Sequence, residues 1–302
     1  MPTIAQRPRG QDGEGLSFSV FVGPAILLYG LFVMVPLVHT VYLSFFQWDG
    51  VGDQVAVGFD NYLEIFRNGD LARSFLHSAV LMVIYLIGSV GLALVITGMI
   101  SRNAIGAARF YQTLLFLPQV IPSVVVGISW RWILAPEGLL NGALEIVGLG
   151  HLRRVWLGDF DTALIALGIV GAWQLYGLFM LMFIAGVQRI SPTLYEAARL
   201  DGAGPVLEFF VITVPGLRRE IVMAIMLAII AAVSSFDLIY VMTRGGPGTS
   251  TTVPALEVYR HAFVYAEVGT AAALGTTIAL IVLAVVWLVG RIRAGDDRSA
   301  RA

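Results

Sequence analysis

SPTLYEAARLDGAGPVLEFFVITVP, residues 191–215, is the most informative stretch of this sequence. It lies between two long apolar runs, so it connects two segments that are each long enough to cross a membrane. Ser191 followed by Pro192 is a typical helix start, and Gly202 suits the end of the same helix. Pro205 can then open a second short helix. The sequence therefore predicts a helix–turn–helix between the two apolar runs.

Two interpretations of this stretch remain open on physical grounds. It can be an ordinary connector that is exposed to water and has no further role. However, Ala197, Ala198 and the paired aromatic residues Phe209 and Phe210 form a close-packed mix that a merely solvated loop does not need. Apolar surface of this kind is typical of a docking site for another protein.

The rest of the chain is far more apolar than a soluble protein. Of its 302 residues, 58% are hydrophobic and 13% are charged, and the mean hydropathy is +0.83. A soluble domain is about 45–50% apolar and about 25% charged. The excess cannot be buried in one water-soluble core, so the chain is expected to span a membrane several times. The net charge of −1 gives no reason to expect a nucleic-acid partner.

Six apolar stretches reach the roughly 20 residues that a helix needs to cross the hydrocarbon core. Only helices satisfy their own backbone polar groups in lipid, so we expect an all-α membrane protein with six transmembrane helices. The expected spans are about 19–46, 78–100, 113–134, 162–187, 221–242 and 268–290. They make one transmembrane domain, 19–290, with short tails at 1–18 and 291–302. The first span is too long for a signal peptide and lacks a cleavage pattern.

Arginine placement predicts the orientation of the spans. The chain has no lysine, and 12 of its 19 arginines fall on the side that holds both termini if six spans are assumed. Basic residues are enriched in loops on the cytoplasmic side. We therefore expect both termini and the loop 191–217 on the inner side of the membrane.

Residue types that are missing exclude several kinds of chemistry. The absence of cysteine excludes disulfides, thiolate metal sites and cysteine nucleophiles. The absence of lysine excludes a P-loop and a Schiff-base enzyme. The four histidines, at 39, 77, 151 and 261, show no metal-ligand spacing. We expect no catalytic residues, no metal and no bound cofactor in this chain, so ATP-driven work would need the ATPase of a partner.

The stretch 191–215 resembles the EAA loop of the permease subunits of ABC importers. The matching residues are Glu196, Ala197, Ala198, Asp201, Gly202, Ala203, Phe209, Ile212 and Pro215. Flanking segments are similar to the sugar-importer branch, which contains the maltose and glycerol-3-phosphate permeases; they are 57–62, 115–118, 236–247 and 269–272. Two positions depart from the pattern, because Arg219 stands where a second proline is common and His77-Ser78 replaces Asn-Thr.

This resemblance implies the fold of a type I ABC-importer permease in a bacterial inner membrane. The chain would pair with a second permease subunit, and two cytoplasmic ATPase subunits holding ATP and Mg would dock on the EAA loops. An extracytoplasmic solute-binding protein would deliver a sugar. Within the loop, Glu196 would be the charged contact to the ATPase and Gly202 the turn. The small and apolar contacts would be Ala197, Ala198, Leu200, Ala203 and Phe209.

Polar side chains inside the expected spans outline a candidate substrate path. They are Gln119, Ser123, Gln174, Ser234, Ser235 and Asp237. The neighbouring Trp173 and Tyr176 could stack on a sugar ring. In the maltose permease, the resemblance places sugar contacts at positions matching Gln119, Ser123 and Ser235. The alternative is structural: serines bond within helices, and Gln174 and Asp237 bond the partner permease.

Other functions are less consistent with the sequence. A permease of the same fold could carry glycerol phosphate, an amino acid or a polyamine, although the flanking motifs favour the carbohydrate branch. A secondary carrier should hold ion-coupling acids inside the membrane, and Asp237 is the only acid well inside an expected span. A membrane enzyme would need a catalytic constellation, which the sequence lacks.

Overall fold

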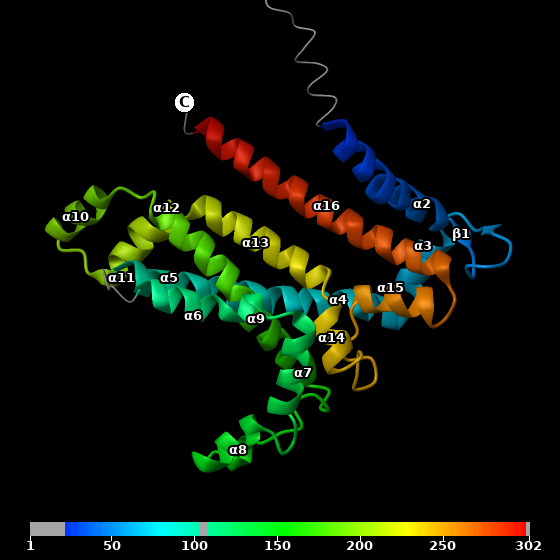
Figure 1. The fold of residues 1–302 in the computed structure, drawn as a ribbon, viewed down its shortest axis with the longest axis horizontal. Helices are drawn as coiled ribbons and strands as arrows, with labels where there is room; N and C mark the ends of the chain where they lie inside the picture. The colour runs from blue at the N-terminus through cyan, green and yellow to red at the C-terminus, as the bar shows by residue number, and fades with distance from the viewer. Residues whose placement is uncertain (1–21, 103–107, 300–302) are drawn as a thin grey trace, which may run out of the picture.

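The computed structural model of the chain describes residues 22–102 and 108–299. The expected N-terminal tail, the first residues of the first span and the last three residues lie outside the described residues. The described part is almost entirely helical, with a single two-stranded antiparallel sheet (Figure 1).

The helices and strands follow one another with short connections. The N-terminal half holds the helix Val22–Leu43, which contains a π-helical segment (Gly30–Met34) and α2 (Val35–Leu43), then β1 (Phe46–Gln47), β2 (Val55–Ala56), α3 (Asp60–Arg67), α4 (Gly69–Tyr85), a π-helical segment (Leu86–Gly91), α5 (Leu92–Arg102), α6 (Ala108–Val120), α7 (Ser123–Ile133) and α8 (Leu139–Ile146). The C-terminal half holds a 3-10 turn (Gly150–Leu152), α9 (Ala163–Val187), α10 (Pro192–Leu200), α11 (Pro205–Glu208), a π-helical segment (Phe209–Thr213), α12 (Val214–Gly216), α13 (Arg218–Val233), α14 (Asp237–Met242), α15 (Pro254–Phe263) and α16 (Val268–Ser299).

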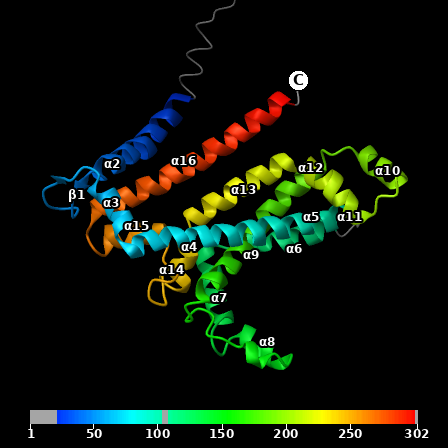
Figure 2. The same ribbon diagram turned by 180° about the vertical axis from the view of Figure 1, so that it is seen from behind.

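Helix α9 lies at the centre of the bundle, against α4, α5, α6 and α13 (Figures 1 and 2). Its most apolar segment is 56% buried, whereas that of Val22–Leu43 is 6% buried. The side chains of Phe179, Met180 and Phe183 on α9 are fully buried. A helix that is apolar on all sides either fills a core or faces lipid. Helix α9 therefore forms the core, and Val22–Leu43, packed along α16, presents most of its surface to lipid.

Among the described residues, four helices are long and apolar enough to cross a membrane, and a bent pair can make a fifth crossing. The four helices are Val22–Leu43, Gly69–Ile100, Ala163–Val187 and Val268–Arg291, and the bent pair is Phe110–Val120 with Ser123–Ile133. The expected fifth span, 221–242, is absent from this set because its helix is interrupted.

The helix of the second crossing extends beyond the expected span, 78–100. It runs from Gly69 to Ile100. The side chain of Asn68 accepts hydrogen bonds from the amides of Asp70 and Leu71 and caps the helix. A cap fixes the start of a helix independently of its apolar face, so the helix begins before the apolar stretch does.

The third expected span, 113–134, is not one continuous helix. Helices α6 and α7 meet at 94° across a short break. Pro122 has no amide hydrogen, and a proline also disfavours the helical conformation in the residue before it, here Ile121. The helix therefore breaks at Pro122, whereas Pro118 remains inside α6.

The fifth expected span is interrupted between α13 and α14. Helix α13 ends at Val233, and α14 begins at Asp237. Serine hydroxyls compete with the helical backbone for hydrogen bonds, and an aspartate is favourable in the first turn of a helix. The polar residues Ser234, Ser235 and Asp237 thus coincide with a break in the crossing.

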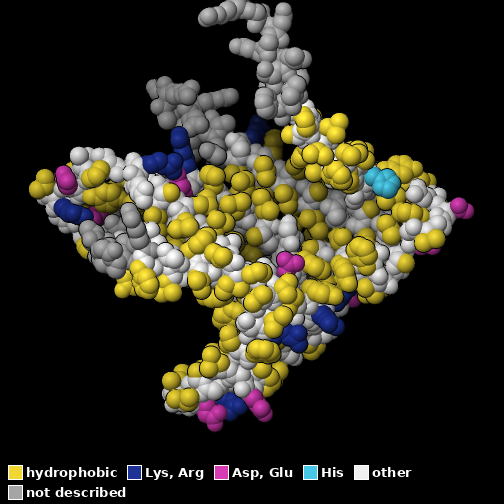
Figure 3. Space-filling view, in the orientation of Figure 1, with side chains coloured by type: hydrophobic (Ala, Val, Ile, Leu, Met, Phe, Trp, Pro, Cys, Tyr) yellow, Lys and Arg dark blue, Asp and Glu magenta, His cyan; other side chains and the backbone are white. Residues whose placement is uncertain are grey.

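Hydrophobic side chains cover most of the face shown in Figure 3. Charged side chains gather at the end of the molecule that holds α10 and at the tip of the arm formed by α7 and α8 (Figures 1 and 3). This distribution fits a bundle whose sides contact lipid and whose ends contact water.

Candidate functional site

The loop 191–217 forms a helix–turn–helix, as predicted. Helix α10 begins at Pro192, and the turn at its end leads into a second limb that runs from α11 through a π-helical segment to α12. Gly202 has a φ of 83°, a left-handed conformation that other residues rarely adopt. The chain therefore reverses direction at Gly202, at one end of the molecule (Figure 1).

Two details of the loop differ from the sequence prediction. Ser191 occupies the N-cap position, but its hydroxyl lies 2.8 Å from that of Thr193 and caps no backbone amide. Pro215 lies inside α12, and the helical limb ends after Gly216. A proline is tolerated in the first turn of a helix, which is where Pro215 stands in this three-residue helix.

An ion pair and a hydrogen bond join the two limbs of the loop. The Nε atom of Arg199 on α10 donates to Oε1 of Glu208 on α11 over 2.9 Å, and the hydroxyls of Tyr195 and Thr213 lie 3.0 Å apart. The Glu208 side chain is only 4% exposed, and its hydrogen bond raises the pKa of Arg199. A buried carboxylate needs such a partner. The pair therefore fixes the angle between the two limbs.

A second ion pair closes the base of the loop. Arg189, which follows α9, pairs with Glu220 in the first turn of α13. The Glu220 side chain is 11% exposed, so the carboxylate is largely shielded from water. The two points where the chain leaves and re-enters the bundle are thus held together. With the pair farther out, this makes the loop a stiff elbow and not a flexible connector.

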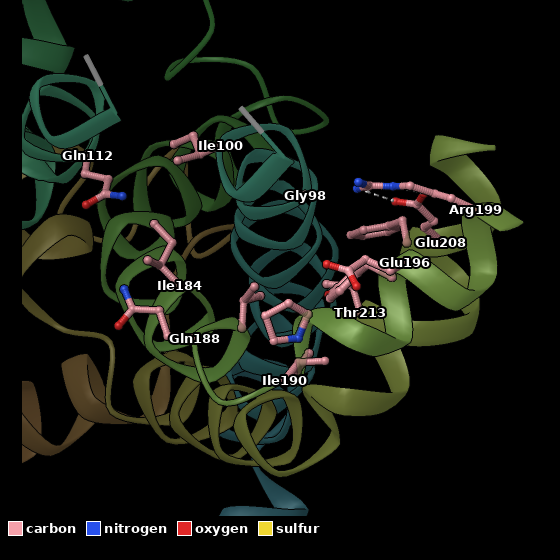
Figure 4. A pocket seen from close by; sticks show the side chains of 14 residues that line it. Gly98, Ile100, Gln112, Ile184, Gln188, Ile190, Glu196, Arg199, Glu208 and Thr213 are labelled. Carbon is pink, nitrogen blue, oxygen red and sulfur yellow. Dashed lines mark hydrogen bonds and ion pairs between the residues drawn. The ribbon is translucent and has the colours of Figure 1, made fainter. Parts of the chain in front are cut away.

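The residues expected to meet a partner lie on the surface of this elbow. Glu196 is exposed and lines a cavity of about 490 Å³ between the loop and the bundle, opposite Gln112 and Ile184 (Figure 4). Leu200, at the tip, is 89% exposed. Ala197, Asp201 and Pro215 are also exposed, whereas Ala198, Ala203 and Ile212 are half-buried along the elbow. Phe209 is expected to contact a partner, but its ring packs against Gly98 of α5, within this chain.

A second cavity, of about 210 Å³, lies where the two broken crossings face α9. It is lined by the predicted polar residues Gln119, Ser123, Gln174, Ser234, Ser235 and Asp237. These residues come from α6, α7, α9 and the break between α13 and α14. Irregular backbone at membrane depth is tolerated only where protein or a water-filled cavity satisfies it. The helix breaks and the polar side chains therefore belong to one feature.

Gln174 has a structural task at this cavity. Its Nε2 atom donates to the carbonyl oxygen of Ile121 over 3.0 Å and to Oγ of Ser123 over 3.3 Å. The break at Pro122 takes the Ile121 carbonyl out of the helical hydrogen-bond ladder. Gln174 therefore supplies the hydrogen bond that this carbonyl lacks, from another helix of the same chain.

Gln119 and Tyr85 complete the wall of the cavity. The Oε1 atom of Gln119 is buried and accepts no hydrogen bond from the residues that the structure describes. Tyr85 is buried and lines the cavity together with Ser235. Sequence analysis missed Tyr85, because a tyrosine within an apolar run reads as a core residue. Only the packing of α4 against the break at Ser234 reveals it.

The two aromatic residues proposed to stack on a sugar lie elsewhere. Trp173 packs edge-on against Trp130, with ring centroids 5.4 Å apart, and Tyr176 is 5% exposed within the core. Neither is among the residues that line the cavity. Trp173 and Tyr176 thus face other parts of the bundle, so their positions do not support stacking on a solute in this cavity.

Comparison with known proteins identifies the family. Residues 95–295 match the family described as binding-protein-dependent transport system inner membrane component. The chain belongs to this family. The resemblance drawn from the stretch 191–215 is therefore confirmed. The permease is a membrane transport component and is not itself an enzyme, which sets aside the secondary carrier and the membrane enzyme.

Similar proteins cover almost the whole permease. YurN of Bacillus subtilis, named a probable ABC transporter permease protein, is 36% identical over 88% of this chain and 91% of its own length. The diacetylchitobiose uptake system permease protein NgcF of Streptomyces coelicolor is 31% identical over 94% of this chain and 85% of its own length. The sulfoquinovosyl glycerol transport system permease protein SmoG of Agrobacterium fabrum is 30% identical over 94% and 92%.

A solved structure has the same fold. It is a bacterial ABC transporter involved in the import of the acidic polysaccharide alginate, with a TM-score of 0.80 and 22% sequence identity. The match covers 93% of this chain and 96% of that chain. The fold of this chain is thus that of an importer permease.

Proposed function

We propose that this chain is one permease subunit of an ATP-driven, binding-protein-dependent sugar importer. A second permease would complete the translocation path, two cytoplasmic ATPase subunits would bind ATP and Mg, and an extracytoplasmic binding protein would deliver the sugar. The observation that carries this proposal is the stiff elbow 191–217 in a chain of the importer-permease family.

The proposed topology has six crossings with both termini in the cytoplasm. Helices α13 and α14 would form the fifth crossing as one broken span, in the way that α6 and α7 form the third. The placement of 12 of the 19 arginines on the side of the termini supports this orientation. It puts the elbow on the same side as the ATPases.

The elbow is proposed to transmit ATPase closure to the bundle. Alternating access requires a two-state bundle that is biased by a partner. A loop that is joined across its limbs and at its base can carry a rotation, whereas a loose loop would dissipate it. Glu196 and Leu200 are exposed, so both are available to a partner surface.

A sugar is the proposed solute, and the 210 Å³ cavity its proposed path. Relatives named for diacetylchitobiose and sulfoquinovosyl glycerol transport, and a structural match to an alginate importer, support this class. Hydroxyl, amide and carboxylate groups can accept and, in part, donate hydrogen bonds to a polyol. Gln119, Ser235 and Asp237 are the residues proposed to meet it, with Tyr85 added from the structure.

Reconstitution with the partner subunits tests the proposal. Proteoliposomes holding both permeases and the ATPases should import labelled sugars from a panel only with ATP and the binding protein. Glu196→Lys should abolish uptake and the stimulation of ATP hydrolysis by loaded binding protein, while the subunit stays in the membrane. Glu137→Lys, a charge reversal at an exposed glutamate on the α7–α8 connection, is the matched control and should import normally.

A second pair of variants probes the turn. Gly202→Val places a β-branched residue at positive φ and should abolish coupling, whereas Gly202→Asn, which tolerates this conformation, should retain much of it. Normal import by both Glu196→Lys and Gly202→Val, or import by the permease alone without ATPase subunits, would contradict the proposed function.

A further inference from the structure

The ring of Phe209, on the second limb of the elbow, lies directly on the backbone of α5 at Gly98. A Cβ atom added to Gly98 would lie 2.8 Å from the Cδ2 and Cε2 atoms of that ring. Real Cβ atoms essentially never come that close. Glycine is therefore the residue that lets the ring rest on the helix backbone, where dispersion contacts are closest.

This contact stands between two hollows. The cavity of about 490 Å³ lies on one side and a hollow of about 530 Å³ on the other, and Gly98, Arg199 and Phe209 line both. The contact of Phe209 with Gly98 is thus a pillar between the elbow and the second crossing, with a hollow on either side. The ion pair of Arg199 with Glu208, the residue before Phe209, fixes the direction from which the ring arrives.

The second crossing links this pillar to the polar cavity. Gly98 and Tyr85 lie on the same helix, Gly69–Ile100, with the π-helical segment Leu86–Gly91 between them. At a rise of about 1.5 Å per residue, the two positions lie about 20 Å apart along it. Tyr85 and Ser235 both line the 210 Å³ cavity. We therefore expect a displacement of the helix end at Gly98 to reach the wall of the cavity through this helix.

We propose that Phe209 and Gly98 form a seat through which the elbow moves the second crossing and, through it, the Tyr85 wall of the cavity. Gly98 is then a positioning residue for transport, although it touches neither the ATPase nor the solute. This inference rests on the proposed function, because it assumes that the elbow is driven by a partner ATPase.

Gly98→Ala is the direct test, and Gly91→Ala is its matched control. Both glycines lie on the second crossing, and a Cβ added to Gly91 meets nothing within 4 Å. Both substitutions replace a glycine by alanine on the same helix, Gly98 within α5 and Gly91 at the end of the π-helical segment, so a larger loss in Gly98→Ala reports the contact with Phe209. Gly98→Ala should lower uptake and binding-protein-stimulated ATP hydrolysis by about tenfold, as expected for overpacking of a fixed contact. Gly91→Ala should leave both unchanged.

Replacing the ring of Phe209 by a smaller side chain should relieve its clash with the Cβ atom that Gly98→Ala introduces. Adding Phe209→Leu to Gly98→Ala should restore at least part of the lost uptake, or of the assembly if the single variant fails to assemble. Equal uptake by Gly98→Ala and Gly91→Ala, while Glu196→Lys still abolishes import, would overturn the seat and leave the proposed function standing. Import that survives Glu196→Lys would instead remove the function on which the seat depends.

A distance measurement tests the seat without altering it. The chain has no cysteine, so spin labels can be attached to cysteines placed at Met99 and Val206, which are 66% and 70% exposed on the two sides of the contact. Their separation should stay constant between the nucleotide-free and ATP-closed complexes. It should broaden or change when Phe209→Ala removes the ring. A separation that already changes with ATP in the unaltered chain would show that elbow and helix move independently.

Discussion

The elbow and the mid-span cavity differ in whether their buried polar groups have partners. In the elbow, the buried carboxylate of Glu208 is paired with Arg199. In the cavity, the buried Oε1 atom of Gln119 has no partner among the described residues. Paired groups rigidify a structure, and an unpaired buried group costs free energy that a bound polar solute can recover. The pairing in the elbow suits a part that transmits force, and the unpaired group in the cavity suits an exchange of partners, as the proposed function requires.

The largest expected effect comes from breaking the pair in the elbow. Arg199→Leu removes the ion pair that Arg199 makes with the largely buried carboxylate of Glu208, and removal of one partner of a buried pair is far more damaging than replacement of both. Uptake in proteoliposomes should fall by about tenfold or more, because the two limbs lose their fixed angle. The double variant Arg199→Leu/Glu208→Leu should import better than Arg199→Leu alone.

Whether the double variant imports more than the single variant decides whether the ion pair has a structural role. If the double variant is as inactive as the single one, or worse, then the charge of Glu208 itself contacts a partner and the elbow is not simply a braced lever. Membrane insertion of both variants should be checked by fluorescence-detected gel filtration.

A smaller effect should separate the two glutamines of the cavity. Gln174→Leu leaves the Ile121 carbonyl unsatisfied and should lower the free energy of unfolding by about 1–3 kcal/mol. Gln119→Leu removes an amide whose oxygen is unpaired, so thermal stability should hold or rise while uptake falls and the order of preferred sugars changes. Thermal unfolding and uptake of a sugar panel, measured on the same preparations, give both readouts.

Loss of stability in Gln119→Leu with unchanged sugar preference would place this residue among the structural groups. The same result would leave the cavity without a demonstrated contact to solute. The contrast between paired polar groups in the elbow and an exchangeable polar group in the cavity would then no longer hold for the cavity.

The sequence predicts the elbow better than the cavity, and the reason is the range of the interactions. Pro192, Gly202 and Pro205 act within a few residues, so helix starts and the turn follow from local rules. Hydropathy also finds the apolar runs, but it cannot show that Pro122 breaks a crossing by 94° while Pro118 does not.

The features that the sequence does not predict depend on contacts between residues that are far apart in the chain. Gln174 donates a hydrogen bond to the Ile121 carbonyl from another helix, and Phe209 packs against Gly98 on the second crossing. Such partners depend on how helices pack, and neither residue carries a local signal for its partner. Trp173 and Tyr176 were proposed to stack on a sugar for their chemistry alone, and their positions on α9 do not support that role.

The smallest expected effect on stability concerns α15, where the ion pairs of His261 with Glu257 and Glu267 depend on pH. Burial disfavours the charged form of His261, but hydrogen bonds to Glu257 and Glu267, the latter over 2.7 Å, outweigh it and raise its pKa. The pKa of Glu257 is lowered despite its burial, by hydrogen bonds and charge from His261 and Arg260. Like the elbow, this region is held by ion pairs. Unlike the elbow, one of its cations is a histidine, the side chain whose ordinary pKa lies near neutrality.

The sign of the pH effect follows from these directions. Protonated His261 stabilises the fold fully below its ordinary pKa of about 6.5, and this contribution is lost as the pH rises through its raised folded-state value. The contribution of Glu257 is lost only as the pH falls through its lowered value, so the wild-type complex should unfold at a higher temperature at pH 6 than at pH 8.5. His261→Gln should reduce that difference, which we expect to be about 1 kcal/mol or less. An equal difference in the variant would show that other groups set the pH dependence, and that the pairing around α15 is as insensitive to pH as the arginine pairs of the elbow.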